Sequence, residues 1–181
     1  MFVKVCGMKH PHQIAELDEL VTFIGFIFYE KSPRYVEETS ALKHANKVGV
    51  FVNADLAELL NQVKKHSLDY VQLHGNESPE YCTAVQPYAR IIKAFGVRTT
   101  EDFAQTISYA NVVDYFLFDT KTPSYGGSGK KFDWTHLQAY SGKTPFLLSG
   151  GIQPDSIDAL LEINHPQLVG VDLNSGFEVD P

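Results

Sequence analysis

The chain alternates short runs of β-branched and aromatic residues with longer stretches in which apolar residues recur at helical spacing. A short run of this kind is typical of a buried strand, and the longer stretches predict helices that cross back over a sheet. The strand ends follow one another at a nearly constant interval, which predicts parallel strands joined by crossover helices. The eight expected strands are Phe2–Cys6, Thr22–Tyr29, Lys47–Val52, Asp69–Leu73, Arg90–Phe95, Asp114–Asp119, Thr144–Ser149 and Leu168–Leu173.

Most crossovers carry a signal for a helix start, either a capping Asp or Ser or a proline in the first turn. In the stretch after Pro154, the spacing predicts that Ile157, Leu160 and Leu161 face inward. Only Tyr35–Ala45 has a weak helical pattern. The expected helix starts are Pro11, Asp55, Ser78, Asp133 and Pro154.

Eight strands at a constant repeat, each with its own crossover, predict an α/β fold of the closed (β/α)8 TIM-barrel type. An open doubly wound sheet is the alternative. No linker or low-complexity tract divides the sequence, so residues 1–181 are expected to form one domain. Only Asn174–Pro181 follow the eighth expected strand, so we expect the final C-terminal helix to be lacking from the chain as given.

Charge and composition narrow the possible partners. The 181 residues include 15 Lys and Arg against 22 Asp and Glu, a formal charge of −7 that argues against a nucleic-acid partner. The longest apolar run, Val21–Tyr29, is too short to span a membrane, and the N-terminus lacks a secretory signal. Two cysteines, Cys6 and Cys82, are expected to be reduced thiols in a cytoplasmic protein. A monomer is expected, with a dimer as the alternative.

In a barrel, functional side chains come from the C-terminal ends of the strands and the loops after them. Cys6 could act there as a thiolate nucleophile or base, although a buried packing role is equally compatible with its position. Asp119 emerges from an apolar strand, which suits an acid catalyst, while capping of the following turn is the alternative. The full set selected by this rule is Cys6, Arg34, Asn53, His74, Asp119, Ser149 and Asp172.

Alternation along the strands adds further expectations. Lys4 should point inward one layer below Cys6, and Gln72 should lie beneath His74. Because the first and last strands of a closed barrel are neighbours, Lys4 and Asp172 are expected to form a buried pair. His74 is expected either to line the wall of the site or to take part in the chemistry.

Glycine-bearing loops at three strand ends favour a phosphorylated ligand. The long Asp119–Trp134 loop contains Gly127 and Gly129 and is predicted to be a mobile lid over the ligand. A flexible surface connection is the alternative. The other two loops occur where barrels often bind phosphate through backbone N–H groups. They contain Gly150 with Gly151, and Ser175 with Gly176. Cys6, His10 and His12 make a poor metal-ligand set, because Pro11 intervenes and no fourth ligand is evident, so a metal is not expected.

Seven separated motifs, in order along the whole chain, closely resemble the phosphoribosylanthranilate isomerase family of tryptophan biosynthesis. They are Lys4-Val-Cys-Gly-Met8; Gly25-Phe-Ile-Phe-Tyr29 with Lys31-Ser-Pro-Arg-Tyr35; Val48-Gly-Val-Phe-Val-Asn53; Val71-Gln-Leu-His-Gly75; Phe118-Asp-Thr with Gly126-Gly-Ser-Gly and Phe132-Asp-Trp134; Leu148-Ser-Gly-Gly151; and Asp172-Leu-Asn-Ser-Gly176.

This resemblance implies a cofactor-free Amadori rearrangement of N-(5′-phosphoribosyl)anthranilate, a small phosphorylated aromatic substrate. Cys6 matches the general base of the family, Asp119 its general acid, and Arg34 the residue that holds the anthranilate carboxylate. The backbone at the glycine-bearing loops would hold the phosphate. His74 and Asp172 are included among the expected substrate-binding residues.

Two other functions remain open at this point. Another cofactor-free isomerase or epimerase of sugar phosphates could share the barrel and the phosphate loops, but it would have no use for a carboxylate-binding Arg34. A domain that only binds a phosphorylated metabolite would need neither a thiolate at Cys6 nor a carboxylic acid at Asp119.

Overall fold

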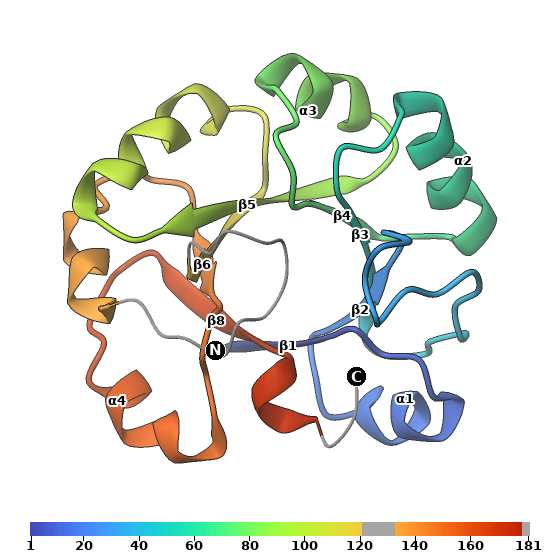
Figure 1. Ribbon diagram of the computed structural model, residues 1–181, viewed down its shortest axis with the longest axis horizontal. Coiled ribbons are helices and arrows are strands. Elements are labelled where there is room, and N and C mark those ends of the chain that lie inside the picture. The colour runs from blue at the N-terminus through green and yellow to red at the C-terminus, as the bar shows by residue number, and fades with distance from the viewer. Residues whose placement is uncertain (121–132, 179–181) are drawn as a thin grey trace.

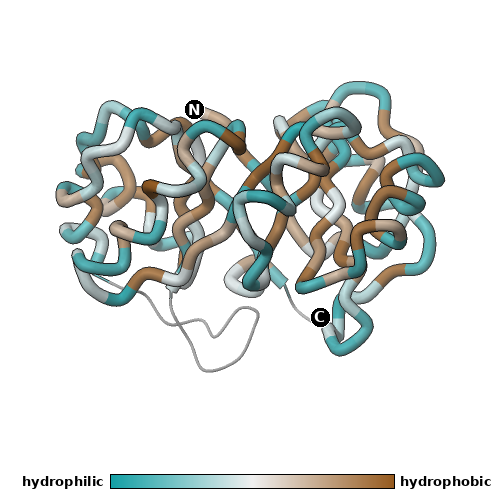
Figure 2. Tube along the Cα trace, turned by 90° about the horizontal axis from the view of Figure 1, so that it is seen from above, coloured by the Kyte–Doolittle hydropathy of each residue, from teal (hydrophilic) through white to brown (hydrophobic). Residues whose placement is uncertain are grey.

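The computed structural model describes residues 1–120 and 133–178 and confirms the expected (β/α)8 barrel. Eight parallel strands pair in sequence order, and the last pairs with the first to close the barrel (Figure 1). Figure 2 shows hydrophobic positions along the inner segments and hydrophilic ones mainly on the outer turns. The strands are β1 (Phe2–Cys6), β2 (Phe23–Ile27), β3 (Asn46–Phe51), β4 (Tyr70–Leu73), β5 (Arg90–Val97), β6 (Tyr115–Thr120), β7 (Phe146–Leu148) and β8 (Leu168–Leu173).

The crossover helices lie outside the ring of strands (Figure 1). Their starts are capped as the sequence predicts: Asp55 accepts hydrogen bonds from the N–H groups of Ala57 and Glu58, and Ser78 accepts one from Tyr81. The α-helices are α1 (Pro11–Leu17), α2 (Leu56–His66), α3 (Pro79–Val85) and α4 (Ile157–Leu161). Short 3-10 helices are η1 (Thr100–Tyr109), η2 (Trp134–Ala139), η3 (Pro154–Ser156) and η4 (Ser175–Phe177).

The weak helix expected over Tyr35–Ala45 is wrong, because this segment has an isolated bridge from Tyr35 to Ile27 and is otherwise bends and irregular backbone. Asp18, which directly follows α1, supplies hydrogen-bond acceptors to backbone N–H groups of the Tyr35–Ala45 segment. The Asp18 carboxylate accepts hydrogen bonds from the N–H groups of Lys43, His44 and Ala45 at 2.7, 3.2 and 2.9 Å. A side chain from a neighbouring element therefore supplies the acceptors that a helix would otherwise provide.

The expected inward orientation of α4 is only partly correct. Leu160 packs against a core cluster, but Ile157 and Leu161 are 61% and 74% exposed. The α-helix has five residues and follows the 3-10 turn η3, so it makes little more than one turn. One turn presents only a narrow face to the barrel, and the other two apolar side chains remain outside it.

Apolar side chains fill the barrel interior at the N-terminal ends of the strands. Phe23, Tyr70 and Leu117 belong to a buried cluster contributed by the first halves of several strands. Phe23 and Tyr70 meet edge to face, with ring centroids 5.1 Å apart. Since apolar side chains close this end, a ligand can enter the barrel only from the C-terminal ends of the strands. No helix in the described parts of the chain is both long and apolar enough to cross a membrane.

Candidate active site

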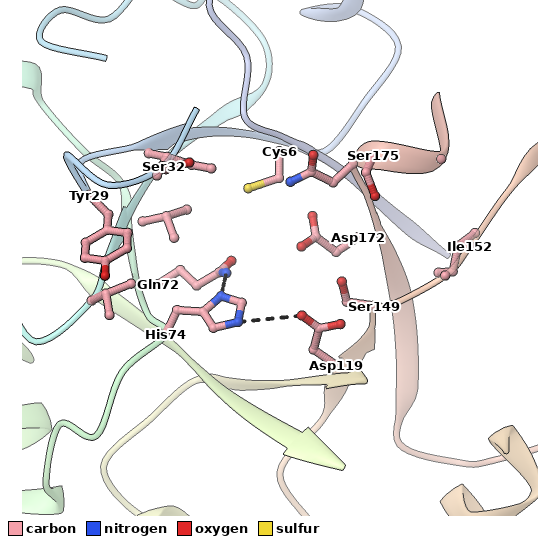
Figure 3. A pocket seen from close by; sticks show the side chains of 17 residues that line it. Cys6, Tyr29, Ser32, Gln72, His74, Asp119, Ser149, Ile152, Asp172 and Ser175 are labelled. Atoms are coloured by element: carbon pink, nitrogen blue, oxygen red, sulfur yellow. Dashed lines mark hydrogen bonds and ion pairs between the residues drawn. The ribbon is translucent and has the colours of Figure 1, made fainter. Parts of the chain in front are cut away.

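A pocket opens at the C-terminal mouth of the barrel, where the strand-end rule places the chemistry (Figure 3). It brings together residues more than 100 positions apart in sequence. The expected residues that line it are Cys6, His74, Asp119, Ser149, Gly150, Gly151, Asp172, Ser175 and Gly176. Gly127 and Gly129 lie outside the described residues.

Cys6 lines the pocket from the end of β1 and is nevertheless only 5% exposed. Below it on the same face of β1 is Lys4, whose Nζ lies 2.8 Å from Oδ1 of Asp172. The two residues are register partners of β1 and β8, so barrel closure makes the pair. This confirms the expected buried ion pair and places a cation beside the thiol.

The acid–base balance of this cluster is set by burial and by its own charges. Burial raises the pKa of the Cys6 thiol, Lys4 opposes that rise, and Asp172 adds to it. Burial also works against the charge on Lys4, but attraction to Asp172 and to Cys6 outweighs it and raises the pKa of Lys4 overall. Lys4 therefore stays charged and is the group that favours a thiolate at Cys6.

Gly25 on β2 makes room for this cluster. A Cβ at this position would lie 2.8 Å from Sγ of Cys6 and 3.2 Å from Nζ of Lys4. The sulfur and the ammonium thus occupy the space that a side chain on the neighbouring strand would take. Any larger residue at this position would push them apart or into the pocket.

Asp119, near the end of β6, faces the pocket from the side opposite Cys6 (Figure 3). Its Oδ1 accepts a hydrogen bond of 2.7 Å from the N–H of Thr120, and its Oδ2 lies 3.6 Å from Nε2 of His74. A Cβ at Gly150 would lie 2.6 Å from Oδ1 of Asp119, and φ at Gly150 is +86°. Only glycine allows the loop after β7 to approach this carboxyl group so closely.

His74 follows β4 and reaches into the pocket beside Gln72 (Figure 3). Its Nδ1 is 3.0 Å from Nε2 of Gln72, which is itself 1% exposed. This agrees with the expected placement of Gln72 beneath His74. The imidazole is thereby held between an amide on its own strand and the Asp119 carboxyl group.

Backbone at the loops after β7 and β8 lines the same pocket. Gly150 and Gly151 both have positive φ, at +86° and +68°, and the 3-10 helix η4 begins at Ser175. Small residues at these positions leave the main chain exposed to a ligand. The geometry is suited to an anionic group held by backbone N–H donors.

Arg34 lies beside this pocket rather than among the residues that line it. Its side chain crosses Gly7, where a Cβ would lie 2.5 Å from Cδ of Arg34. Its Nε donates to both carboxylate oxygens of Glu178, at 2.6 and 2.9 Å, and Nη2 also contacts Oε2. The expected carboxylate-binding arginine thus does hold a carboxylate, one supplied by the chain itself.

The strand-end residue Asn53 proves to be structural. Its side-chain oxygen accepts from the N–H of Asn76 at 2.7 Å, and its own N–H donates to Oε1 of Glu77 at 2.8 Å. Glu77 also pairs with the buried Lys93 at 3.2 Å. This network joins the loops that follow β3 and β4 at the C-terminal end of the barrel.

The sequence analysis does not assign some pocket residues to the site. Asn174 is one of them, although it belongs to the Asp172–Gly176 motif. Tyr29 and Ser32 lie in the motif that contains Arg34, which is the only signal that could have identified them. The described residues contain no group of three or more His, Cys, Asp or Glu side chains arranged to hold a metal ion.

Comparison with known proteins adds an independent finding. The family model of N-(5′-phosphoribosyl)anthranilate (PRA) isomerase matches residues 3–180. An N-(5′-phosphoribosyl)anthranilate isomerase from Parabacteroides distasonis is 50% identical over 191 aligned positions, which cover 100% of this chain and 86% of that protein.

Two solved structures share the fold over the whole chain. Monomers generated from the dimeric phosphoribosylanthranilate isomerase of Thermotoga maritima have a TM-score of 0.83 and 29% identity, covering 100% of this chain and 90% of theirs. A phosphoribosylanthranilate isomerase in complex with reduced 1-(o-carboxyphenylamino)-1-deoxyribulose 5-phosphate has a TM-score of 0.80 and 28% identity, with the same coverage.

Proposed function

Because the chain belongs to the N-(5′-phosphoribosyl)anthranilate isomerase family, we propose that it performs this isomerisation with Cys6 as base and Asp119 as acid. The product is 1-(2-carboxyphenylamino)-1-deoxyribulose 5-phosphate, and the reaction is a step of tryptophan biosynthesis. The observation that carries the proposal is the position of Cys6 and Asp119 on opposite sides of one pocket (Figure 3).

The two groups divide the proton transfers between them. Protonated Asp119 donates to the furanose ring oxygen, and cleavage of the C–O bond opens the ring to an iminium ion. The Cys6 thiolate then removes the C2′ proton to give an enolamine, which tautomerises to the ketone. Each positioned acid or base of this kind typically contributes about 10²- to 10⁴-fold in rate.

The two anionic ends of the substrate have separate binding groups in this proposal. Backbone N–H groups at Gly150, Gly151, Ser175 and Gly176 hold the phosphate, together with Gly127 and Gly129 outside the described residues. Arg34 binds the anthranilate carboxylate. Its contact with Glu178 supports this role, because it uses Nε and Nη2 and leaves the N–H groups of Nη1 for a second carboxylate.

The test is turnover of freshly generated substrate, followed by loss of its anthranilate-type fluorescence. Cys6→Ser and Asp119→Asn are each expected to lower kcat by about 100-fold or more while still binding the reduced product analogue. Arg34→Lys should mainly raise KM, because a single ammonium group cannot bind Glu178 and the substrate carboxylate with separate N–H groups as the guanidinium can.

Matched controls separate chemistry from folding. Cys82→Ser changes a buried thiol on α3 outside the pocket, and Asp155→Asn changes an exposed carboxylate on η3; both should retain turnover. If neither Cys6→Ser nor Asp119→Asn lowers kcat by about tenfold, the assigned roles are wrong.

We also propose an oligomeric state and a cellular compartment for the protein. Both cysteines are free thiols, which supports a reducing compartment and hence the cytoplasm. We take the protein to be a monomer, with a dimer as the alternative because the Thermotoga maritima relative is dimeric. Light scattering during gel filtration and cell fractionation test these two points.

A further inference from the structure

Three polar side chains form a chain of contacts across the pocket from β4 to β6 (Figure 3). Nε2 of Gln72 lies 3.0 Å from Nδ1 of His74, and Nε2 of His74 lies 3.6 Å from Oδ2 of Asp119. Gln72 and His74 are two positions apart along one strand direction, so both point to the same side. Gln72 is therefore connected to Asp119 only indirectly, through the imidazole of His74.

The contact with Gln72 determines which ring nitrogen carries a proton. A neutral imidazole has one N–H donor and one acceptor nitrogen. In the orientation that the structure gives this amide, Nε2 of Gln72 donates, so Nδ1 of His74 accepts and the ring proton lies on Nε2, facing Asp119. With the amide reversed, the lone pair of Nε2 would face the carboxyl oxygen instead, an unfavourable contact whenever Asp119 is ionised.

The same contact opposes protonation of the imidazole. An imidazolium would carry a second N–H on Nδ1, directed at the N–H of Gln72. On the other side of the ring, Nε2 of His74 lies 3.6 Å from Oδ2 of Asp119. An imidazolium at 3.6 Å would hold Asp119 as a carboxylate, which has no proton to donate.

We propose that Gln72 is a positioning residue that keeps His74 neutral with its proton on Nε2, so that Asp119 retains the proton it donates to the substrate. Once that proton leaves, Nε2–H of His74 and N–H of Thr120 each stabilise one oxygen of the new carboxylate. The inference rests on the proposed role of Asp119 as acid.

Gln72 has a second feature that fits this role. Its side chain is 1% exposed, and its Oε1 has no hydrogen-bond partner among the described residues. A buried amide normally satisfies both of its polar atoms. Here its one hydrogen bond in the described parts of the chain is directed at His74, and Leu at this position would fill similar space without that donor.

The first test reads the tautomer directly in the substrate-free protein. In protein labelled with ¹⁵N-histidine, the His74 signals are those lost in His74→Asn. The wild type should show the neutral Nε2–H tautomer. Gln72→Leu should show mixed tautomers, and Gln72→Glu, whose carboxylate accepts from Nδ1–H, should show imidazolium.

The second test asks whether the tautomer matters for turnover. Gln72→Leu is expected to lower kcat about tenfold and Gln72→Glu about 100-fold, with the affinity for the reduced product analogue changed less than threefold. Gln62→Leu removes a half-buried amide on α2, away from the pocket, and should leave tautomer and kcat unchanged.

Two results would overturn the inference. One is a wild-type His74 that is imidazolium or protonated on Nδ1, and the other is a Gln72→Glu protein that forms imidazolium but keeps wild-type kcat. Failure of the proposed function would be seen differently. If Asp119→Asn kept full turnover, Asp119 would not be the acid, irrespective of the His74 tautomer found by NMR.

Discussion

The Lys4 ammonium lies between two acidic groups, the Asp172 carboxylate and the Cys6 thiol, and hydrogen bonds to both. The carboxylate competes with the thiol for this positive charge. A buried cation stabilises a neighbouring thiolate only to the extent that another anion has not already compensated it. The reactivity of Cys6 is therefore governed by Lys4, one layer below the pocket, and by Asp172 in the pocket wall.

This competition predicts opposite effects of two substitutions. Lys4→Met should raise the pKa of Cys6 further, because the favourable cation is lost. Asp172→Asn should lower it, because Lys4 then faces the thiol alone. The measurement is the pH dependence of iodoacetamide modification of Cys6, by mass spectrometry in a Cys82→Ala background. The midpoint should move up in the first variant and down in the second, and shifts in the same direction would contradict this account.

At this scale, part of the site could be predicted from sequence. The Lys4–Asp172 contact follows from side-chain alternation and barrel closure, both visible in the strand pattern. The partner of Arg34 could not be predicted, because Glu178 is 144 positions away and lies on no periodic element. A loop side chain has no register that fixes what it meets.

The connection between β2 and β3 shows how one side chain can replace a helix. Asp18 accepts three N–H groups of this connection, at Lys43, His44 and Ala45. Burial alone would raise the pKa of Asp18, but these hydrogen bonds outweigh it and lower the pKa overall. Because the bonds favour the ionised form, the folded state is stabilised by an ionised Asp18.

Asp18→Asn is expected to destabilise the fold by about 1 to 2 kcal/mol, since asparagine offers one carbonyl oxygen and no charge. For a chain of this size the melting temperature should fall by about 2 to 4 °C per kcal/mol. The folded pKa lies below the unfolded value of about 3.9, so the difference from wild type is full above that pH. It shrinks as the pH falls through the folded pKa.

Thermal melts of wild type and variant at pH 7 and pH 3 measure this effect. Asp155→Asn, at an exposed carboxylate on η3, serves as the control and should melt like wild type at both values. An Asp18→Asn protein whose deficit is as large at pH 3 as at pH 7 would show that its carboxylate charge is not the cause.

Barrel closure depends on a small residue at the seam between β8 and β1. Gly170 is the register partner of Phe2, and a Cβ there would lie 2.5 Å from the carbonyl oxygen of Phe2 and 2.7 Å from Cδ2 of Leu147. The carbonyl belongs to the main chain of β1 and cannot move without disturbing its pairing. The same seam carries Lys4 and Asp172, so closure and the site are mechanically linked.

Gly170→Ala is expected to lower stability by about 1 to 3 kcal/mol through overpacking at this seam. The loss should appear in urea unfolding as a lower midpoint with an unchanged slope. Ser141→Ala, a small change in an exposed loop, is the control. A midpoint equal to that of the control would mean that the seam has room for a side chain.

The sequence by itself determined the strands, their order, the helix caps and the end of the barrel that carries the chemistry. Each of these depends on local signals: residue periodicity, capping side chains and the direction of parallel strands. The tertiary structure decided the rest. It gave the Tyr35–Ala45 segment its acceptors from Asp18, left Ile157 and Leu161 outside the core, and joined Gln72, His74 and Asp119 into one chain of contacts. These outcomes depend on which atoms meet across elements, and hydrogen bonds and burial between distant residues leave no periodic signal in the chain.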